Sequence, residues 1–195
     1  LLVKWHGVEV TGITLAESQR RGAVVGSCVV QGDWLENRFD SGLFDGLVAI
    51  ESLEHMPDPA RALREVARVV KPGGRVVLAC WVQAPRMSWL ERKLVVDPIA
   101  RSAVLGGMSC GRLVVERVRK AGLEVVGVED LSREVARSWS ECFRRCLGLM
   151  VKNGDLRRRI LVMGPRALGL AMSLLRIRFA YHTGLLRYLL IRARR

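Results

Sequence analysis

Three polar residues that could bind a ligand each follow an apolar run of the sequence. Thr14 ends the run VEVTGIT, and Asp33 comes shortly after the run at residues 23–31. Glu51 directly follows the run FDGLVAI. Such runs are typical of strands, and in open α/β sheets ligands bind beyond the carboxyl ends of the strands. A hydroxyl or carboxylate at these positions could hold the polar groups of a ligand, so we expect a site where these strands end.

Glu54 and His55 could contribute proton chemistry, because they lie just past the most apolar of these runs. Histidine is the side chain whose ordinary pKa suits proton removal near neutral pH. We therefore expect His55 to act as a base, with Glu54 orienting it or stabilising charge. A structural role, in which His55 caps the following helix or holds the loop, remains the alternative.

Strands and helices must alternate along the chain to position these residues. The apolar patterns predict strands over residues 8–14, 23–31, 44–50, 75–81 and 123–130, with a further strand over 184–194. Helices are expected over residues 16–23, 58–70, 111–121, 133–150 and 156–175. This order predicts an α/β fold with a mostly parallel, Rossmann-like sheet and helices on both faces. Residues 71–74 (KPGG) are expected to form a turn without chemical function.

Residues 44–81 (FDGLVAIESLEHMPDPARALREVARVVKPGGRVVLACW) resemble the central block of class I S-adenosylmethionine-dependent methyltransferases. The branch that they resemble holds tocopherol methyltransferases, sugar O-methyltransferases and, more distantly, cyclopropane fatty acid synthases. VTGITLAESQ at 10–19 resembles the second strand and loop of these enzymes, and GDWLE at 32–36 their adenine-contacting turn. LLRYLLIRARR at 185–195 resembles their last strand.

The resemblance implies that S-adenosylmethionine is the cofactor and assigns residues to its parts. Ribose contacts fall to Thr14, Leu15 and Gln19, and adenine contacts to Asp33 and Trp34. The methionine end would meet Ile50 and Glu51. The alternatives are structural: Thr14 as a helix cap, Gln19 as a surface residue, and Gly32-Asp33 as an ordinary turn.

The same resemblance implies one partial methyltransferase domain over residues 1–195. Residues 1–81 would form the cofactor-side core, and residues 82–195 the substrate-side helices and last strands. The family's first strand and its glycine-rich loop have no counterpart in the sequence, so we expect an N-terminally truncated chain that binds the cofactor poorly on its own. An inactive or split methyltransferase fragment with a binding role is the alternative function.

Charge and composition bear on the acceptor and the partners. Residues 1–111 hold 13 Lys or Arg and 12 Asp or Glu, whereas residues 112–195 hold 19 and 7, giving net charges of +1 and +12. Together with the apolar residues of the variable region, this predicts a small lipophilic acceptor such as a prenylated phenol, terpenoid or glycoside. We expect a cytoplasmic protein with possible peripheral contact to anionic membrane, and no nucleic acid partner. The five cysteines are scattered without a CxxC pair, so no metal site is predicted.

Overall fold

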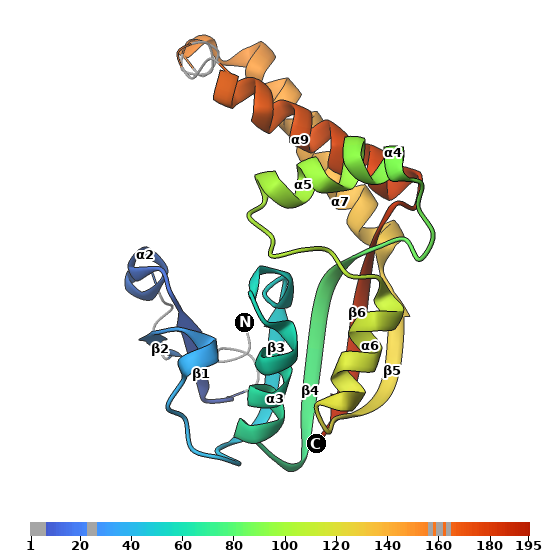
Figure 1. Cartoon of the computed structure of the whole chain (residues 1–195). Coiled ribbons are helices and arrows are strands. Elements are labelled where there is room, and N and C mark those ends of the chain that lie inside the picture. The colour runs from blue at the N-terminus through green and yellow to red at the C-terminus, as the bar shows by residue number, and fades with distance from the viewer. Residues whose placement is uncertain (1–6, 23–26, 156–157, 159–161, 163–164) are drawn as a thin grey trace.

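The computed structural model describes residues 7–22, 27–155, 158, 162 and 165–195 (Figure 1). The strands are β1 (Val10–Thr14), β2 (Ser27–Gln31), β3 (Phe44–Ile50), β4 (Val70–Gln83), β5 (Glu124–Asp130) and β6 (Leu186–Arg194). The α-helices are α2 (Glu17–Arg21), α3 (Pro59–Val69), α4 (Trp89–Glu91), α5 (Asp97–Ser102), α6 (Gly111–Lys120), α7 (Ser132–Lys152) and α9 (Pro165–His182). Two 3₁₀ turns, η1 (Trp34–Glu36) and η2 (Leu53–His55), and a π-helical turn, η3 (Arg92–Val96), complete the set.

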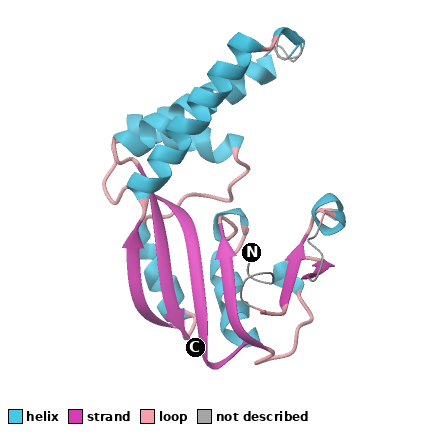
Figure 2. Cartoon of the chain, turned by 180° about the vertical axis from the view of Figure 1, so that it is seen from behind, coloured by secondary structure: helices cyan, strands magenta, loops and turns pink. Residues whose placement is uncertain are grey.

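The described strands form two sheets. One pairs β1 with β2 in parallel, and the other has the order β3-β4-β6-β5. β3 and β4 are parallel, while β6 runs antiparallel to both β4 and β5, so β6 alone is reversed in its sheet. The arrowheads of β1 and β3 point the same way in Figure 2. This confirms the α/β fold with a mostly parallel sheet. Among the described strands, no ladder joins the β1–β2 pair to the four-stranded sheet.

One face of β4 builds the first core cluster, which also contains α3 and α6. Val76, Leu78, Cys80 and Val82 alternate along β4 and are buried on this face. α3 contributes Leu63 and Val66, and its start is set as the sequence predicts: Pro59 occupies the first turn and the Asp58 carboxylate accepts a hydrogen bond from Arg61 N–H at 2.9 Å. The alternation of β4 is thus the local reason why these helices cover this face.

The opposite face of β4 carries the second core cluster near the carboxyl end of the strand. Ala79 and Trp81 pack there with residues of β6, α5 and α9. We call α4, η3, α5, α7 and α9 the helical cap; Figure 1 shows it above the end of the sheet. Within the described part of the chain, no helix of the cap or elsewhere has the length and apolar character that a membrane span requires.

The structure corrects three expectations. The helix expected over 156–175 ends later than predicted, because α9 (Pro165–His182) continues to just before Gly184, whose φ of 74° favours glycine; the earlier part of that prediction, residues 156–164, lies largely outside the described residues. Residues 71–74 lie within β4 as a bulge, because the register jumps from Phe44↔Val70 to Gly46↔Arg75. The helical segment over 89–102 was not predicted, because its large apolar residues are divided between the surface (Trp89, Leu90 and Leu94) and the core (Val96 and Ile99).

Candidate active site

The loops after β1 and β2 contact each other. Thr14 pairs with Gln31 at the end of the parallel ladder, and Gly32 N–H donates to the Thr14 carbonyl at 2.9 Å. The Thr14 hydroxyl donates to Gln19 Oε1 at 2.6 Å and accepts from Ala16 N–H at 3.1 Å. The hydroxyl thus fixes the amide plane of Gln19. Two side chains predicted for ribose binding, those of Thr14 and Gln19, are thus joined by a hydrogen bond.

Asp33 and Trp34 fix the turn after β2. The Asp33 carboxylate accepts from Leu35 N–H at 2.8 Å, which caps η1. The Trp34 indole N–H donates to the Ala62 carbonyl of α3 at 3.0 Å. The Gly32-Asp33 turn therefore has the structural role that was the alternative. The turn also holds the second carboxylate oxygen of Asp33 at the same sheet end as Thr14.

Glu51 sits at a strained position directly after β3. Its φ is 49°, in the left-handed region that few residues other than glycine adopt, and its N–H donates to the Ala79 carbonyl at 2.8 Å. Such conformations cost on the order of 1–3 kcal/mol and cluster at functional sites. The neighbouring Ile50 is 64% exposed, and Leu15 after β1 is 72% exposed. Two large apolar side chains at the predicted cofactor loops are thus open to a ligand that could cover them.

Glu54 lies inside the protein at the end of β4. Its side chain is 7% exposed, and Oε1 accepts from the backbone N–H of Trp81 at 2.8 Å. Burial raises the pKa of the Glu54 carboxyl, and the charge of Glu51 raises it further, against the opposing hydrogen bond from Trp81. Glu54 is therefore a carboxyl that holds its proton more readily than an exposed glutamate.

His55 points to a different partner. Its Nδ1 lies 3.2 Å from the Val104 carbonyl, and because a carbonyl only accepts, Nδ1 carries the proton there. In the neutral tautomer with this donor, the lone pair lies on Nε2 of the exposed ring. No hydrogen bond joins the Glu54 and His55 side chains in the described residues, so the Val104 carbonyl orients the ring. Val104 itself has a φ of 54°, which is unusual for a β-branched residue.

Two tyrosines extend this site in a way the sequence analysis did not anticipate. Tyr188 of β6 hydrogen-bonds Glu51, and burial together with the Glu51 charge raises the pKa of its hydroxyl. Tyr181 of α9 is 6% exposed, and its ring meets Trp81 edge-on with centroids 6.3 Å apart. The alternation of apolar residues in the last strand indicates which side chains share a face with Tyr188. The antiparallel register then places Tyr188 opposite Trp81.

A cavity of about 520 Å³ lies beside α6 and is separate from this site. Its walls include Arg112, Arg119 and Arg187, and none of the residues predicted for cofactor or catalysis. In the described residues, no group of His, Cys, Asp and Glu is arranged to hold a metal ion.

Comparison with known proteins gives these residues a context. Residues 2–78 match the family described as methyltransferase domain. The 27-O-demethylrifamycin SV methyltransferase of Amycolatopsis mediterranei is 33% identical over 153 residues, which cover 74% of this chain and 56% of that protein. Tocopherol O-methyltransferase of Arabidopsis thaliana is 29% identical over 161 residues, covering 75% of this chain and 46% of that protein.

A solved structure has the same fold. The geranyl diphosphate C-methyltransferase of Streptomyces coelicolor superposes with a TM-score of 0.73 at 20% identity, covering 99% of this chain and 64% of that one. The chain spans about half the length of the curated relatives it matches. The resemblance seen in the sequence is confirmed at the level of family and fold.

Proposed function

Because the chain belongs to the class I methyltransferases, a family that uses S-adenosylmethionine, we propose that the protein transfers a methyl group to a small lipophilic acceptor. The acceptor would be a prenylated phenol, terpenoid or glycoside natural product. Relatives named for 27-O-demethylrifamycin SV and for tocopherol support this class. The observation that carries the proposal is the family match over residues 2–78, which contain the predicted cofactor loops after β1, β2 and β3.

S-adenosylmethionine, when bound, supplies a methyl group on a sulfonium. Thr14, Leu15 and Gln19 would hold the ribose, and Asp33 and Trp34 the adenine. The Gln19 amide N–H₂ is left to donate because its oxygen accepts from Thr14. Ile50 and Glu51 would lie along the methionine end, where the Glu51 carboxylate suits a cationic ligand.

Calorimetry with S-adenosylmethionine tests the cofactor assignment in the protein as its gene encodes it. Thr14→Val and Asp33→Asn should each weaken binding by about 5- to 20-fold, since each changes one hydrogen bond to the ligand. Asn at position 33 still accepts from Leu35 N–H, so the turn is kept. Asp45→Asn is the matched control, because Asp45 is exposed at the amino end of β3. Binding unaffected by both site variants would contradict the assignment.

His55 is the proposed proton acceptor through Nε2, with Glu54 as the second candidate. Loss of a general base typically lowers turnover by about 10²- to 10⁴-fold. A screen with labelled cofactor against lipophilic phenols, terpenoids and glycosides would identify the acceptor, after which His55→Ala should show a fall in kcat. Retained kcat would remove His55 from the mechanism. Absence of transfer to every acceptor by a protein that binds the cofactor would favour the inactive, binding role.

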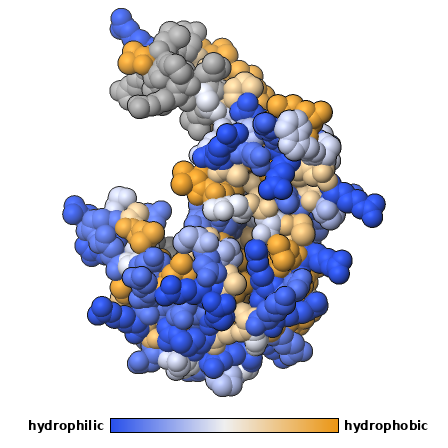
Figure 3. Space-filling view, in the orientation of Figure 1, coloured by the Kyte–Doolittle hydropathy of each residue, from blue (hydrophilic) through white to orange (hydrophobic). Residues whose placement is uncertain are grey.

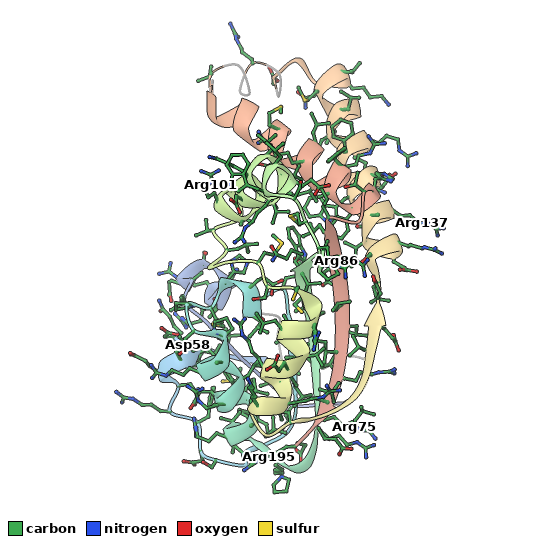
Figure 4. All side chains as sticks on the ribbon, turned by 45° about the vertical axis from the view of Figure 1, so that its right-hand side comes forward. Asp58, Arg75, Arg86, Arg101, Arg137 and Arg195 are labelled. Carbon is green, nitrogen blue, oxygen red and sulfur yellow. The ribbon has the colours of Figure 1, made fainter. Side chains whose placement is uncertain are left out.

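We also propose that the helical cap contacts an anionic membrane. Trp89, Leu90 and Leu94 are 67%, 58% and 63% exposed on one short segment, and the Lys93 ammonium lies 4.6 Å from the Trp89 ring centroid. Figure 3 shows apolar side chains on the cap surface, and Figure 4 places Arg101 and Arg137 on opposite sides of it. Exposed aromatic and aliphatic side chains flanked by basic ones are typical of interfacial segments.

Co-sedimentation with phosphatidylglycerol vesicles at low salt tests this contact. The protein should bind these vesicles and leave phosphatidylcholine vesicles in the supernatant. Replacing Trp89 and Leu94 together by Ser should reduce binding by at least 10-fold, whereas Val126→Ser, at a 57% exposed position of β5, should not. Equal binding by the double variant and the parent protein would refute the contact.

A further inference from the structure

Three buried polar atoms of the second core cluster and its edge have no hydrogen-bond partner. They are Glu54 Oε2, Trp81 Nε1 and the Tyr181 hydroxyl, and they are the buried unpartnered side-chain atoms found in the described residues. The three side chains are 7%, 7% and 6% exposed. A buried polar group without a partner is unfavourable, and natural proteins contain few. Their presence together points to a ligand.

The three side chains meet around Trp81. The Trp81 backbone N–H binds the other oxygen of Glu54, at 2.8 Å, and the Trp81 ring contacts the Tyr181 ring. The charges of Glu51 and Glu54 both act on Tyr181. Three elements that are distant in sequence, η2, β4 and α9, thus bring two donors and one acceptor to the carboxyl end of β4, next to Glu51.

Two donors and one acceptor match a single hydroxyl group. A hydroxyl oxygen has lone pairs that can accept from Trp81 Nε1 and from the Tyr181 hydroxyl, and its proton can be donated to Glu54 Oε2. The surroundings are otherwise apolar, because Ile99, Ile177 and Leu186 are buried in the same cluster. A hydroxyl attached to an apolar body suits this combination best.

We propose that Glu54, Trp81 and Tyr181 bind the hydroxyl group of a phenol or alcohol acceptor and that Glu54 receives its proton. The inference rests on the proposed methyl transfer. In the proton step, the acceptor O–H bond breaks and a bond forms between the proton and Glu54 Oε2. The electron pair stays on the acceptor oxygen, and Glu54 becomes a neutral carboxylic acid. Glu54 then takes the place of His55 as the proton acceptor, and His55 keeps its contact with the Val104 carbonyl.

Fragment binding tests the site without knowledge of the full acceptor. The probes are 4-methylphenol and 4-methylanisole, which share a ring and differ in the O–H. NMR of ¹⁵N-labelled protein, encoded in full and saturated with S-adenosylhomocysteine, follows the Trp81 indole resonance, assigned from its loss in Trp81→Phe. We expect 4-methylphenol to shift this resonance and to bind at least 5-fold more tightly than 4-methylanisole. Equal affinities, or no shift of the Trp81 resonance, would overturn the proposal.

Variants separate binding from folding. Tyr181→Phe should reduce the affinity for 4-methylphenol by about 5- to 10-fold, the usual effect of one hydrogen bond, and leave 4-methylanisole unchanged. Its melting temperature should equal or exceed that of the parent, because the hydroxyl removed has no partner. A fall of the melting temperature would show that the hydroxyl is bonded within the fold and would contradict the site. Trp139→Phe, which trims a ring that touches Trp81 edge-on, should keep the preference for the phenol.

The outcomes distinguish this inference from the proposed function. Cofactor binding by calorimetry without discrimination between the two fragments would overturn the hydroxyl site and leave methyl transfer standing. Discrimination between the fragments in a protein that fails to bind S-adenosylmethionine would support the hydroxyl site and overturn the proposed methyl transfer. Glu54→Gln should also abolish the preference for the phenol, since an amide cannot take up the proton.

Discussion

Polar side chains beside the two faces of β4 differ in their hydrogen bonding. On the face of the first core cluster, the Arg68 guanidinium at its edge binds the Phe39 carbonyl at 2.5 Å, Asn37 Oδ1 at 2.9 Å and Glu65 Oε2 at 2.7 Å. On the other face, polar atoms of Glu54, Trp81 and Tyr181 are buried without partners. The polar groups beside the first face are partly exposed and hydrogen-bonded, whereas these three atoms of the second face are buried without a partner.

Backbone strain follows the same division. Glu51 and Val104, the two residues other than glycine with positive φ in the described chain, both lie at the site end of the sheet. A strained backbone conformation persists when the contacts of the surrounding structure hold the residue in it. The comparison leads us to expect that the first cluster contributes more to stability than the region around the unpartnered atoms.

The largest effect should come from the first cluster. Leu63 is fully buried between α3 and the sheet, so Leu63→Ala should lower the free energy of unfolding by about 2–5 kcal/mol. The matched control is Leu94→Ala in the helical cap, where the side chain is 63% exposed and the expected change is below about 0.5 kcal/mol. Urea denaturation measures both. Equal losses of unfolding free energy in Leu63→Ala and Leu94→Ala would contradict the comparison, because the helical cap would then contribute as much to stability as the first cluster.

Much of the sheet follows from local patterns. Phe44–Ile50 and the start of α3 at Pro59 are placed as predicted, because near-continuous apolar runs and a proline at the first helical position are local signals. Thr14, Asp33 and Glu51 could be picked out for the same reason, since a strand end is visible in the sequence. Their roles toward a cofactor remain predictions.

The acceptor side could not be predicted in the same way. Tyr188 comes to lie opposite Trp81 only through the antiparallel insertion of β6 between β4 and β5, which no local pattern specifies. Tyr181 reaches the site because α9 continues to His182, beyond the predicted end. The unpartnered state of Glu54 depends on packing among distant elements. Residues whose function arises from such juxtaposition are visible only in three dimensions.

A smaller effect is expected from the satisfied polar network beside the first cluster. Arg68→Ala removes the side-chain donor to the Phe39 carbonyl and one of the donors to Asn37 Oδ1, so the free energy of unfolding should fall by about 1–3 kcal/mol. Arg64→Ala, at an exposed position of the same helix, should change it by less than about 0.5 kcal/mol. Thermal and urea unfolding of both variants provide the measurement. A neutral Arg68→Ala would show that this face tolerates unpartnered polar atoms as the other face does.

The subtlest test uses the two glutamates, whose pKa values are shifted in opposite directions. Burial raises the pKa of Glu54 above its ordinary value of 4.5, whereas the hydrogen bond from Arg68 lowers that of Glu65 below the same value. Because the pKa of Glu54 is raised in the folded protein, its contribution to the free energy of unfolding is lost as the pH rises from 4.5 through the folded-state pKa. Because the pKa of Glu65 is lowered in the folded protein, its contribution to the free energy of unfolding is fully present above pH 4.5 and is lost as the pH falls through the folded-state pKa.

The free energies of unfolding of Glu54→Gln and Glu65→Gln, measured from about pH 3 to pH 8, should therefore diverge from that of the parent in opposite senses. Each difference should change by no more than about 1.4 kcal/mol per pH unit. Glu54→Gln should gain on the parent as the pH rises above 4.5, because the amide escapes ionisation in a buried place while its oxygen still accepts from the Trp81 N–H. Glu65→Gln should fall behind the parent as the pH rises from the folded-state pKa of Glu65 toward 4.5, and its deficit should stay constant above 4.5, because it lacks the charge that Arg68 stabilises. A pH-independent difference for Glu54→Gln would mean that solvent reaches this carboxyl in the folded protein, and the contrast between the two faces of β4 would then lose its electrostatic basis.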